Sequence, residues 1–144
     1  NEAIIKLNGE MAFSGSATVP FDVENGAASA AAASLATGSI TPAQNNALII
    51  AASSHQTNQP TVGITIDSGM TKQVDFPNNA QAKVGIFAYK IQTAAAAINP
   101  TITNNDANSD TAVAVASFLA AAVSGFSLNI NNLRPNAFAP GLAR

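Results

Sequence analysis

The 144-residue chain contains no cysteine and no tryptophan, and His55 is its only histidine. Without cysteine the chain cannot form disulfides, zinc–thiolate sites, iron–sulfur clusters or a thiol nucleophile. No apolar run approaches the roughly 20 residues that a membrane-spanning helix needs, so we expect no membrane partner. The length is typical of one domain with enough chain to bury a core.

Charge is scarce as well, because charged residues make up 10% of the chain against about 25% in an average soluble domain. Six Lys and Arg oppose eight Asp and Glu, and the basic residues do not cluster. A nucleic-acid surface needs clustered Lys and Arg, so we expect no nucleic-acid partner. Alanine fills 31 positions and asparagine 16. Such a surface is typical of a protein that buries its exterior against neighbours or works outside the cytosol.

Hydrophobic residues recur mainly with a period of two, and turn residues separate the segments. The clearest predicted strands are Ala47–Ala52, Thr61–Ile66, Lys83–Ile91 and Thr111–Phe118. In the first of these, Leu48–Ile50 is a continuous apolar run, as expected for a strand that is covered on both faces. About nine or ten short strands without a long amphipathic helix predict an all-β fold, an antiparallel β-sandwich or a barrel. We take the β-sandwich as the expected fold.

Other segments carry turn and loop signals. Asn25-Gly26 is a hairpin-type dipeptide and predicts that a strand over Thr18–Glu24 ends there. The alanine-rich segment Ala27–Ala36 predicts a loop or a short helical turn, because alanine is weak in strands. Ser53–Pro60 reads as a polar loop, and Gly125–Ile130 as the last strand.

The last 14 residues, Asn131–Arg144, contain two prolines and a glycine and predict no regular element. We therefore divide the chain into a β-sandwich domain, 1–130, and an extended C-terminal arm, 131–144. Leu133, Phe138 and Leu142 are spaced so that each can reach a separate pocket on another chain. With Arg134 they are the expected subunit-contact residues. The alternative is a frayed terminus.

Catalytic groups are few. His55 lies in a Ser-Ser-His-Gln-Thr-Asn segment, and no G-x-S-x-G motif accompanies it, so we expect a solvated loop histidine. Asp67 and Asp75 flank a hairpin-like unit and could form a glycosidase pair, with Glu10, Asp22 and Glu24 as further acids. Asp67 is explained more simply as a turn initiator before Ser68-Gly69. We expect neither an enzyme nor a cofactor.

The segment Asp106–Asp110 has the D-x-N-x-D spacing that begins a calcium loop. The rest of the pattern is missing, because Thr111 stands where the loop needs glycine and Ser117 where it needs a bidentate glutamate. A polar connection between strands is the simpler interpretation, and we expect no metal.

Seven of the eight aromatic residues fall into three groups. Five phenylalanines lie in predicted strands and are expected in the core: Phe13, Phe21, Phe87, Phe118 and Phe126. Tyr89 is the one candidate for a sugar-stacking platform, since tyrosine combines an apolar face with a polar handle. Phe138, in the C-terminal arm, is the expected anchor on another subunit.

One stretch resembles a known family. Ser39–Ala51, a polar turn followed by the strand Ala-Leu-Ile-Ile-Ala, resembles the opening of a jelly-roll module found in tailed-phage structural proteins and in bacterial surface or secreted proteins. The order that follows is also similar: Val62–Ile66, a turn at Gly69, Phe87–Lys90 and Ala112–Phe118. The end of the chain, 133–144, resembles the short F-A-P-G-x-A-R endings of some phage virion proteins.

This resemblance implies a jelly-roll fold and a non-enzymatic structural protein of a tailed-bacteriophage virion. Such a subunit would be a capsid decoration or cement protein, or a tail-associated or fibre module. Its partners would be other virion proteins and further copies of itself. The alternative is a secreted carbohydrate-binding or adhesin module with the same sandwich, because fold alone does not separate these functions.

Overall fold

The computed structural model describes residues 13–56, 63–75, 83–104 and 106–121, and this part of the chain is all β. Its eight strands are β1 (Ser16–Ser29), β2 (Ser34–Ala36), β3 (Ala47–Gln56), β4 (Thr65–Ile66), β5 (Thr71–Asp75), β6 (Lys83–Gln92), β7 (Thr101–Thr103) and β8 (Asp110–Ala120). Across these residues no helix is long and apolar enough to cross a membrane.

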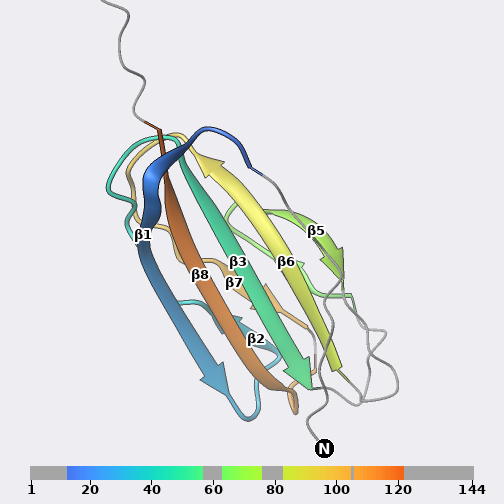
Figure 1. Ribbon diagram of the computed structural model, residues 1–144. Coiled ribbons are helices and arrows are strands. Elements are labelled where there is room, and N and C mark those ends of the chain that lie inside the picture. Colours follow the sequence, from blue (N-terminus) through green and yellow to red (C-terminus); the bar gives the residue numbers. More distant parts are fainter. Residues whose placement is uncertain (1–12, 57–62, 76–82, 105, 122–144) are drawn as a thin grey trace, which may run out of the picture.

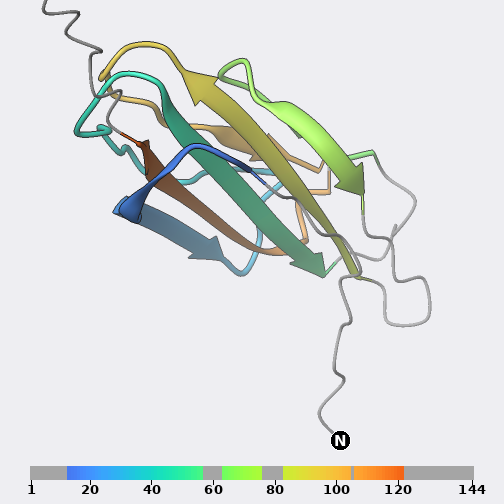
Figure 2. The ribbon, with the colours of Figure 1, turned by 45° about the horizontal axis from the view of Figure 1, so that its top comes forward.

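The strands form two antiparallel sheets, which confirms the predicted β-sandwich (Figure 1). The larger sheet has the order β1-β8-β3-β6-β5, and the smaller one the order β2-β7-β4. Figure 2 shows the smaller sheet as a second layer along one face of the larger sheet. We call that face of the five-stranded sheet its inner face, and the opposite one its outer face.

The core lies between the two sheets because alternate residues of each strand point inward. From the large sheet, Ile49, Ile86 and Val115 contribute fully or almost fully buried side chains. Ile64 and Ile102, from the side of the small sheet, are also fully buried. The core forms two adjoining clusters, and half-buried Ile66 packs against both of them.

Most strong strand predictions are confirmed. Lys83–Ile91 and Thr111–Phe118 lie within β6 and β8, and Ala47–Ala52 forms the first part of β3. The strand predicted over Thr61–Ile66 is shorter in its described part, where β4 covers Thr65–Ile66. The prediction of a turn at Asp67-Ser68-Gly69 is also confirmed. Ser68 and Gly69 have positive φ angles of 60° and 67°, and Met70 N–H donates back to the Asp67 carbonyl over 3.2 Å.

Three local predictions are wrong. Asn25-Gly26 is no hairpin turn, because β1 continues through it and pairs with β8 as far as Ser29. Ala27–Ala36 is not a loop or helical turn throughout, since its ends belong to β1 and β2. Ser53–Gln56 continues β3 and is paired on both sides, with β6 and with β8. In each case sheet pairing outweighs a local turn or composition signal.

Other predictions concern residues outside the described part. These are the last strand Gly125–Ile130, the boundary at residue 130, and the arm 131–144 with Leu133, Arg134, Phe138 and Leu142.

Candidate functional site

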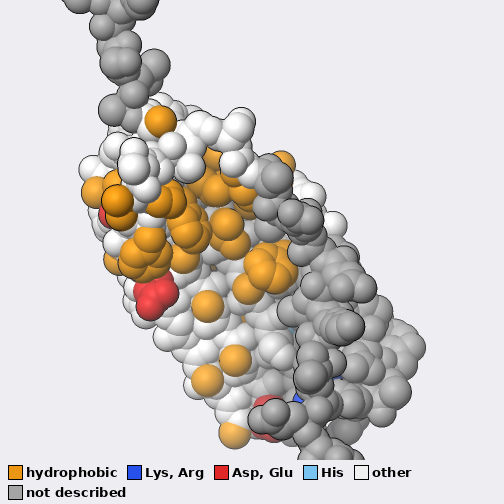
Figure 3. All heavy atoms as spheres, viewed as in Figure 1, with side chains coloured by type: hydrophobic (Ala, Val, Ile, Leu, Met, Phe, Trp, Pro, Cys, Tyr) orange, Lys and Arg blue, Asp and Glu red, His pale blue; other side chains and the backbone are white. Residues whose placement is uncertain are grey.

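Exposed apolar side chains, Phe21 and Ile91 among them, gather on the outer face of the five-stranded sheet (Figure 3). The strand register places its residues in cross-strand rows, one from each of β1, β8, β3 and β6. The large row consists of Phe21, Phe118, Leu48 and Ile91. Two middle rows follow, Glu24–Ala116–Ile50–Tyr89 and Gly26–Ala114–Ala52–Phe87, and then the small row of Ala28, Ala112, Ser54 and Gly85.

The large row is open to solvent although it is hydrophobic. Phe21 is 52% exposed and Ile91 is 49% exposed, while Leu48 and Phe118 are half-buried. The Phe21 and Phe118 rings meet edge to face with their centroids 6.3 Å apart. Just outside the row, the Phe13 ring lies 5.5 Å from the Tyr89 ring. This end of the face is therefore a broad aromatic and aliphatic ridge.

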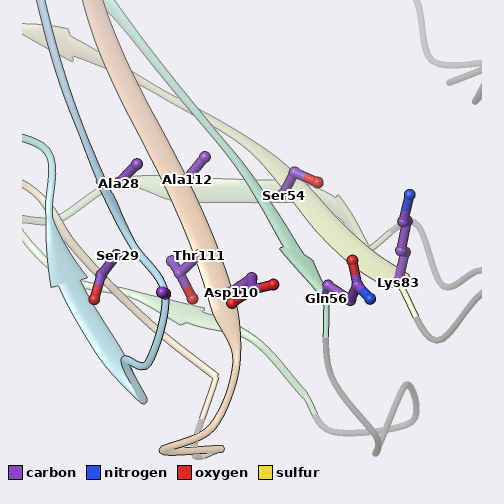
Figure 4. A pocket seen from close by; sticks show the side chains of 9 residues that line it. Ala28, Ser29, Ser54, Gln56, Lys83, Asp110, Thr111 and Ala112 are labelled. Carbon is purple, nitrogen blue, oxygen red and sulfur yellow. The ribbon is translucent and has the colours of Figure 1, made fainter.

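The opposite end of the face is nearly flat because its side chains are small. One hollow of about 450 Å³ lies over the two middle rows and is lined by Ile50, Ala52 and Ala114, among others. A second hollow of about 450 Å³ lies at the small row and is lined by Ala28, Ala112 and Ser54, and also by Gln56, Lys83 and Asp110. Figure 4 shows the short side chains of the second hollow beside β1, β8 and β3. The outer face thus changes from a ridge to a depression along the strands.

Charge is confined to the margins of this face. Glu24 belongs to β1, which is an edge strand of the sheet. Beyond the small row, Asp110, Gln56 and Lys83 form a polar end (Figure 4). An apolar centre with a polar rim is the usual composition of a protein–protein contact surface.

The outer face overturns one prediction. Phe21, Phe87 and Phe118 are not core residues but belong to the outer face, and Phe13 is 40% exposed. Phe126 lies outside the described residues. A period of two shows which residues share a face of a strand, but it does not show which face is inward. The continuous apolar run Leu48–Ile50 was the signal that could have indicated a second apolar face.

A second candidate site surrounds His55, which is fully buried on the inner face of β3 and is not the solvated loop residue predicted. Its Nε2 lies 2.8 Å from Ser53 Oγ, and its Nδ1 lies 2.9 Å from Asn104 Nδ2. Thr111 Oγ1 is 3.1 Å from the same Nδ1 and donates to the Ala32 carbonyl. Burial lowers the pKa of His55 below its ordinary value.

This network holds one form of the histidine. Asp106 N–H donates to Asn104 Oδ1 over 2.8 Å, so the Asn104 amide nitrogen faces His55 as a donor. Nδ1 must then accept, which leaves the proton on Nε2 to donate to Ser53 Oγ. The imidazole is neutral, and its neighbours are two hydroxyls and an amide. Among the described residues, the side chains bonded to the His55 ring are hydroxyls and an amide, not the carboxylate that orients the histidine of a catalytic triad.

The acidic residues that could have formed a hydrolytic pair have structural contacts. Asp22 Oδ2 accepts from Ala43 N–H at 2.9 Å and from the fully buried Ser117 hydroxyl at 2.7 Å. Asp67 Oδ1 accepts from Thr101 N–H at 2.7 Å and from Ser68 Oγ at 2.8 Å. Burial alone would raise the pKa of Asp67, but these hydrogen bonds outweigh it and lower the pKa.

The other acidic residues do not strengthen the hypothesis of a hydrolytic pair. Glu24 is exposed on β1, Asp75 ends β5, and Glu10 lies outside the described residues. In the part of the chain that the structure describes, the hydrogen-bond partners of Asp22 and Asp67 are backbone amides and hydroxyls rather than other acids.

The segment with calcium-loop spacing is a turn that leads into β8. Asp106 Oδ1 accepts from Asn108 N–H over 3.0 Å, and Asp110 is the first residue of the strand. Among the described residues, no group of three or more His, Asp or Glu side chains could hold a metal ion.

Comparison of the chain with family models, curated proteins and solved structures found no match. The candidate site is therefore defined by its geometry, and the outer face is the strongest feature.

Proposed function

We propose that this chain is a non-enzymatic structural subunit of a tailed-bacteriophage virion, acting as a capsid decoration, cement or tail-associated protein. In this proposal the sandwich, of jelly-roll type, is a rigid spacer, and its apolar outer face makes protein contacts. The C-terminal arm, with Leu133, Arg134, Phe138 and Leu142, supplies further subunit contacts.

The observation that carries the proposal is the exposed apolar outer face. Exposed apolar patches larger than a few hundred Å² usually mark interaction sites. Here the large row combines with alanine and glycine positions over four strands. The low charge content of the chain also favours a protein that buries its exterior against neighbours.

The test is whether the chain is part of a particle. Antibodies raised against the purified chain are applied to fractions of a phage lysate separated on a density gradient. We expect the chain to band with intact particles and to remain there after high-salt washing, because apolar contacts are not screened by salt. A chain found only among free soluble proteins would contradict the proposal.

The alternative is a secreted carbohydrate-binding or adhesin module, and Tyr89 is the residue that favours it. Tyr89 is half-buried on the outer face beside Phe13, so its ring could serve as part of a stacking platform. Binding to a defined glycan that is lost in Tyr89→Ala would support this function. A glycan array without binding, together with banding on particles, would exclude it.

A further inference from the structure

We propose that the outer face is the contact surface of a two-fold symmetric homodimer, in which the large row of one copy packs on the small row of the other. The inference rests on the proposed structural function, because it names the partner of the same face. It commits to a second copy of this chain as the occupant.

The first argument comes from the central strand. On β3, Ile49 and Ala51 point inward and are fully buried, whereas Leu48 and Ile50 point outward. A strand with apolar residues on both faces is typical of a sheet that is covered twice. Within the described residues, the three-stranded sheet covers the inner face only. The outer face of β3 therefore has the composition of a covered strand, although no strand among the described residues covers it.

The second argument is the complementarity of the face with itself. Successive rows are two residues apart, so the large and small rows are separated by three steps, or about 20 Å. A two-fold axis that crosses the strands between the two middle rows exchanges these rows. It places Phe118 over Ala112, Leu48 over Ser54 and Ile91 over Gly85 of the second copy. Each side chain of the large row then meets a small one, as close packing requires, while Tyr89 meets Phe87 of the second copy at the β6 side of the middle rows.

The hollow at the small row supports the same orientation. It has a volume of about 450 Å³ and is lined by Ala28, Ala112 and Ser54, with Gln56, Lys83 and Asp110 at its polar end (Figure 4). In the proposed dimer it lies opposite the Phe21–Phe118 ring pair of the second copy. By the symmetry of the arrangement, the second copy offers the same hollow to the first ring pair. Parallel packing, with large row on large row, would leave the two small ends facing each other across a gap.

Size and charge also fit a second copy. Four strands and four rows give the face a plan area of about 500 Å², and projecting side chains increase the accessible area. This approaches the roughly 800 Å² per partner of a standard interface. Glu24 is the only charged residue in the four rows, and it belongs to the edge strand, where an interface rim tolerates charge. A face with so little charge suits an equally apolar partner.

Dimer formation is tested on the full purified chain. We expect sedimentation to report twice the chain mass of 14.5 kDa. Ala114, exposed at the centre of the outer face, is changed to glutamate, which brings like charges together across the symmetry axis. We expect Ala114→Glu to fold, as judged by circular dichroism, and to sediment as a monomer. Thr65→Glu, at an exposed position of β4 in the other sheet, is the matched control and should remain a dimer.

The outcomes separate this inference from the proposed function. A chain that is monomeric at high concentration but bands with particles overturns the dimer and leaves the proposed function standing. A dimer that does not band with particles supports the homodimer and contradicts the proposed function. A dimer that survives Ala114→Glu uses another surface, which overturns the inference.

The orientation is tested with introduced cysteines, since the chain has none of its own. In the proposed dimer, Leu48 of one copy opposes Ser54 of the other, while each is about 20 Å from its own equivalent. After refolding together in a glutathione buffer, Leu48→Cys and Ser54→Cys chains should form a mixed disulfide dimer. Each variant alone should form none. Efficient self-linking of either variant alone would indicate the parallel arrangement and overturn the packing of large row on small row.

Discussion

Asn104 donates a hydrogen bond from Nδ2 to Nδ1 of the fully buried His55 over 2.9 Å. The donor is fixed in place because Asn104 Oδ1 is already occupied by Asp106 N–H. A proton on Nδ1 would face another donor, so the folded protein favours the neutral imidazole. This hydrogen bond joins β3 to the loop before β8. Because it favours the neutral imidazole, the stability of the fold depends on pH.

We predict that the chain loses stability as the pH falls below about 6.5. The folded pKa of His55 lies below the ordinary value of 6.5, because of burial, so the unfolded chain binds this proton first. Stability is therefore complete above 6.5 and declines as pH falls toward the folded pKa, by at most about 1.4 kcal/mol per pH unit. Urea unfolding at pH 7.5 and pH 5.5 measures the change.

His55→Gln is the control for this pH dependence. The variant has no group at this position that titrates between pH 5 and 8. We expect it to be less stable at neutral pH, and its free energy of unfolding to vary less between the two pH values. An equal loss of stability in both proteins would show that another group is responsible.

A second prediction compares two isoleucines of β6 that point to opposite faces. Ile86 is 1% exposed and Ile91 is 49% exposed. Ile86→Ala should lower the free energy of unfolding by about 2–5 kcal/mol, because it leaves a cavity in the core. Ile91→Ala should change it by less than about 1 kcal/mol when both are measured in the monomeric Ala114→Glu background. Equal losses would contradict the assignment of the two faces.

A third prediction concerns Asp22. Removing its carboxylate in Asp22→Ala leaves the buried Ser117 hydroxyl and the Ala43 N–H without this acceptor. An unsatisfied buried polar group costs about 1–3 kcal/mol, so we expect a loss of that size in the free energy of unfolding. Glu24→Ala, at an exposed position of the same strand, is the control and should have a small effect. Chemical denaturation of both variants compares them directly.

A fourth prediction is that a chelator leaves the thermal midpoint unchanged. The carboxylate of Asp106 has a structural contact within its own turn, where it accepts a hydrogen bond from Asn108 N–H. Thermal melting with EDTA, with added calcium, and with neither provides the measurement. A midpoint that rises with calcium, and no longer does so in Asp106→Asn, would restore the calcium loop.

The all-β class and the main strands could be predicted from the sequence because alternation carries that information locally. Lys83–Ile91 shows two apolar sets, and the structure assigns Val84 and Ile86 to the core and Ile91 to the outer face. The pattern could not make that assignment, since it depends on which face the second sheet covers. The hairpin turn predicted at Asn25-Gly26 was wrong because contacts distant in the sequence decide the structure there. The turn tendency of this dipeptide is local, whereas continuous pairing with β8 and the bond from Asn25 Nδ2 to the Ser39 carbonyl are long-range.

The environment of His55 could not be predicted from the sequence either. Its partners Asn104 and Thr111 lie 49 and 56 positions away in the chain. The pairing of β3 with β8 places His55 directly opposite Thr111, and Asn104 reaches the ring from the position after β7. The surrounding Ser, Gln and Thr residues suggested a loop, although on β3 the Ser53 hydroxyl contacts the buried His55 ring.

The last prediction concerns the C-terminal arm, 131–144, and separates its role from that of the outer face. Ordering a segment costs about 1–2 kcal/mol per residue for the backbone alone, so such an arm gains order only by docking. Burial of an anchor such as Phe138 contributes roughly 1.5–3 kcal/mol. We expect deletion of 131–144 to leave the thermal midpoint and the dimer unchanged, and to weaken sedimentation with particles. A triple variant, Leu133→Ser, Phe138→Ser and Leu142→Ser, should behave like the deletion, because it removes the anchors and keeps the length. Unchanged particle binding in both would show that the arm makes no subunit contact.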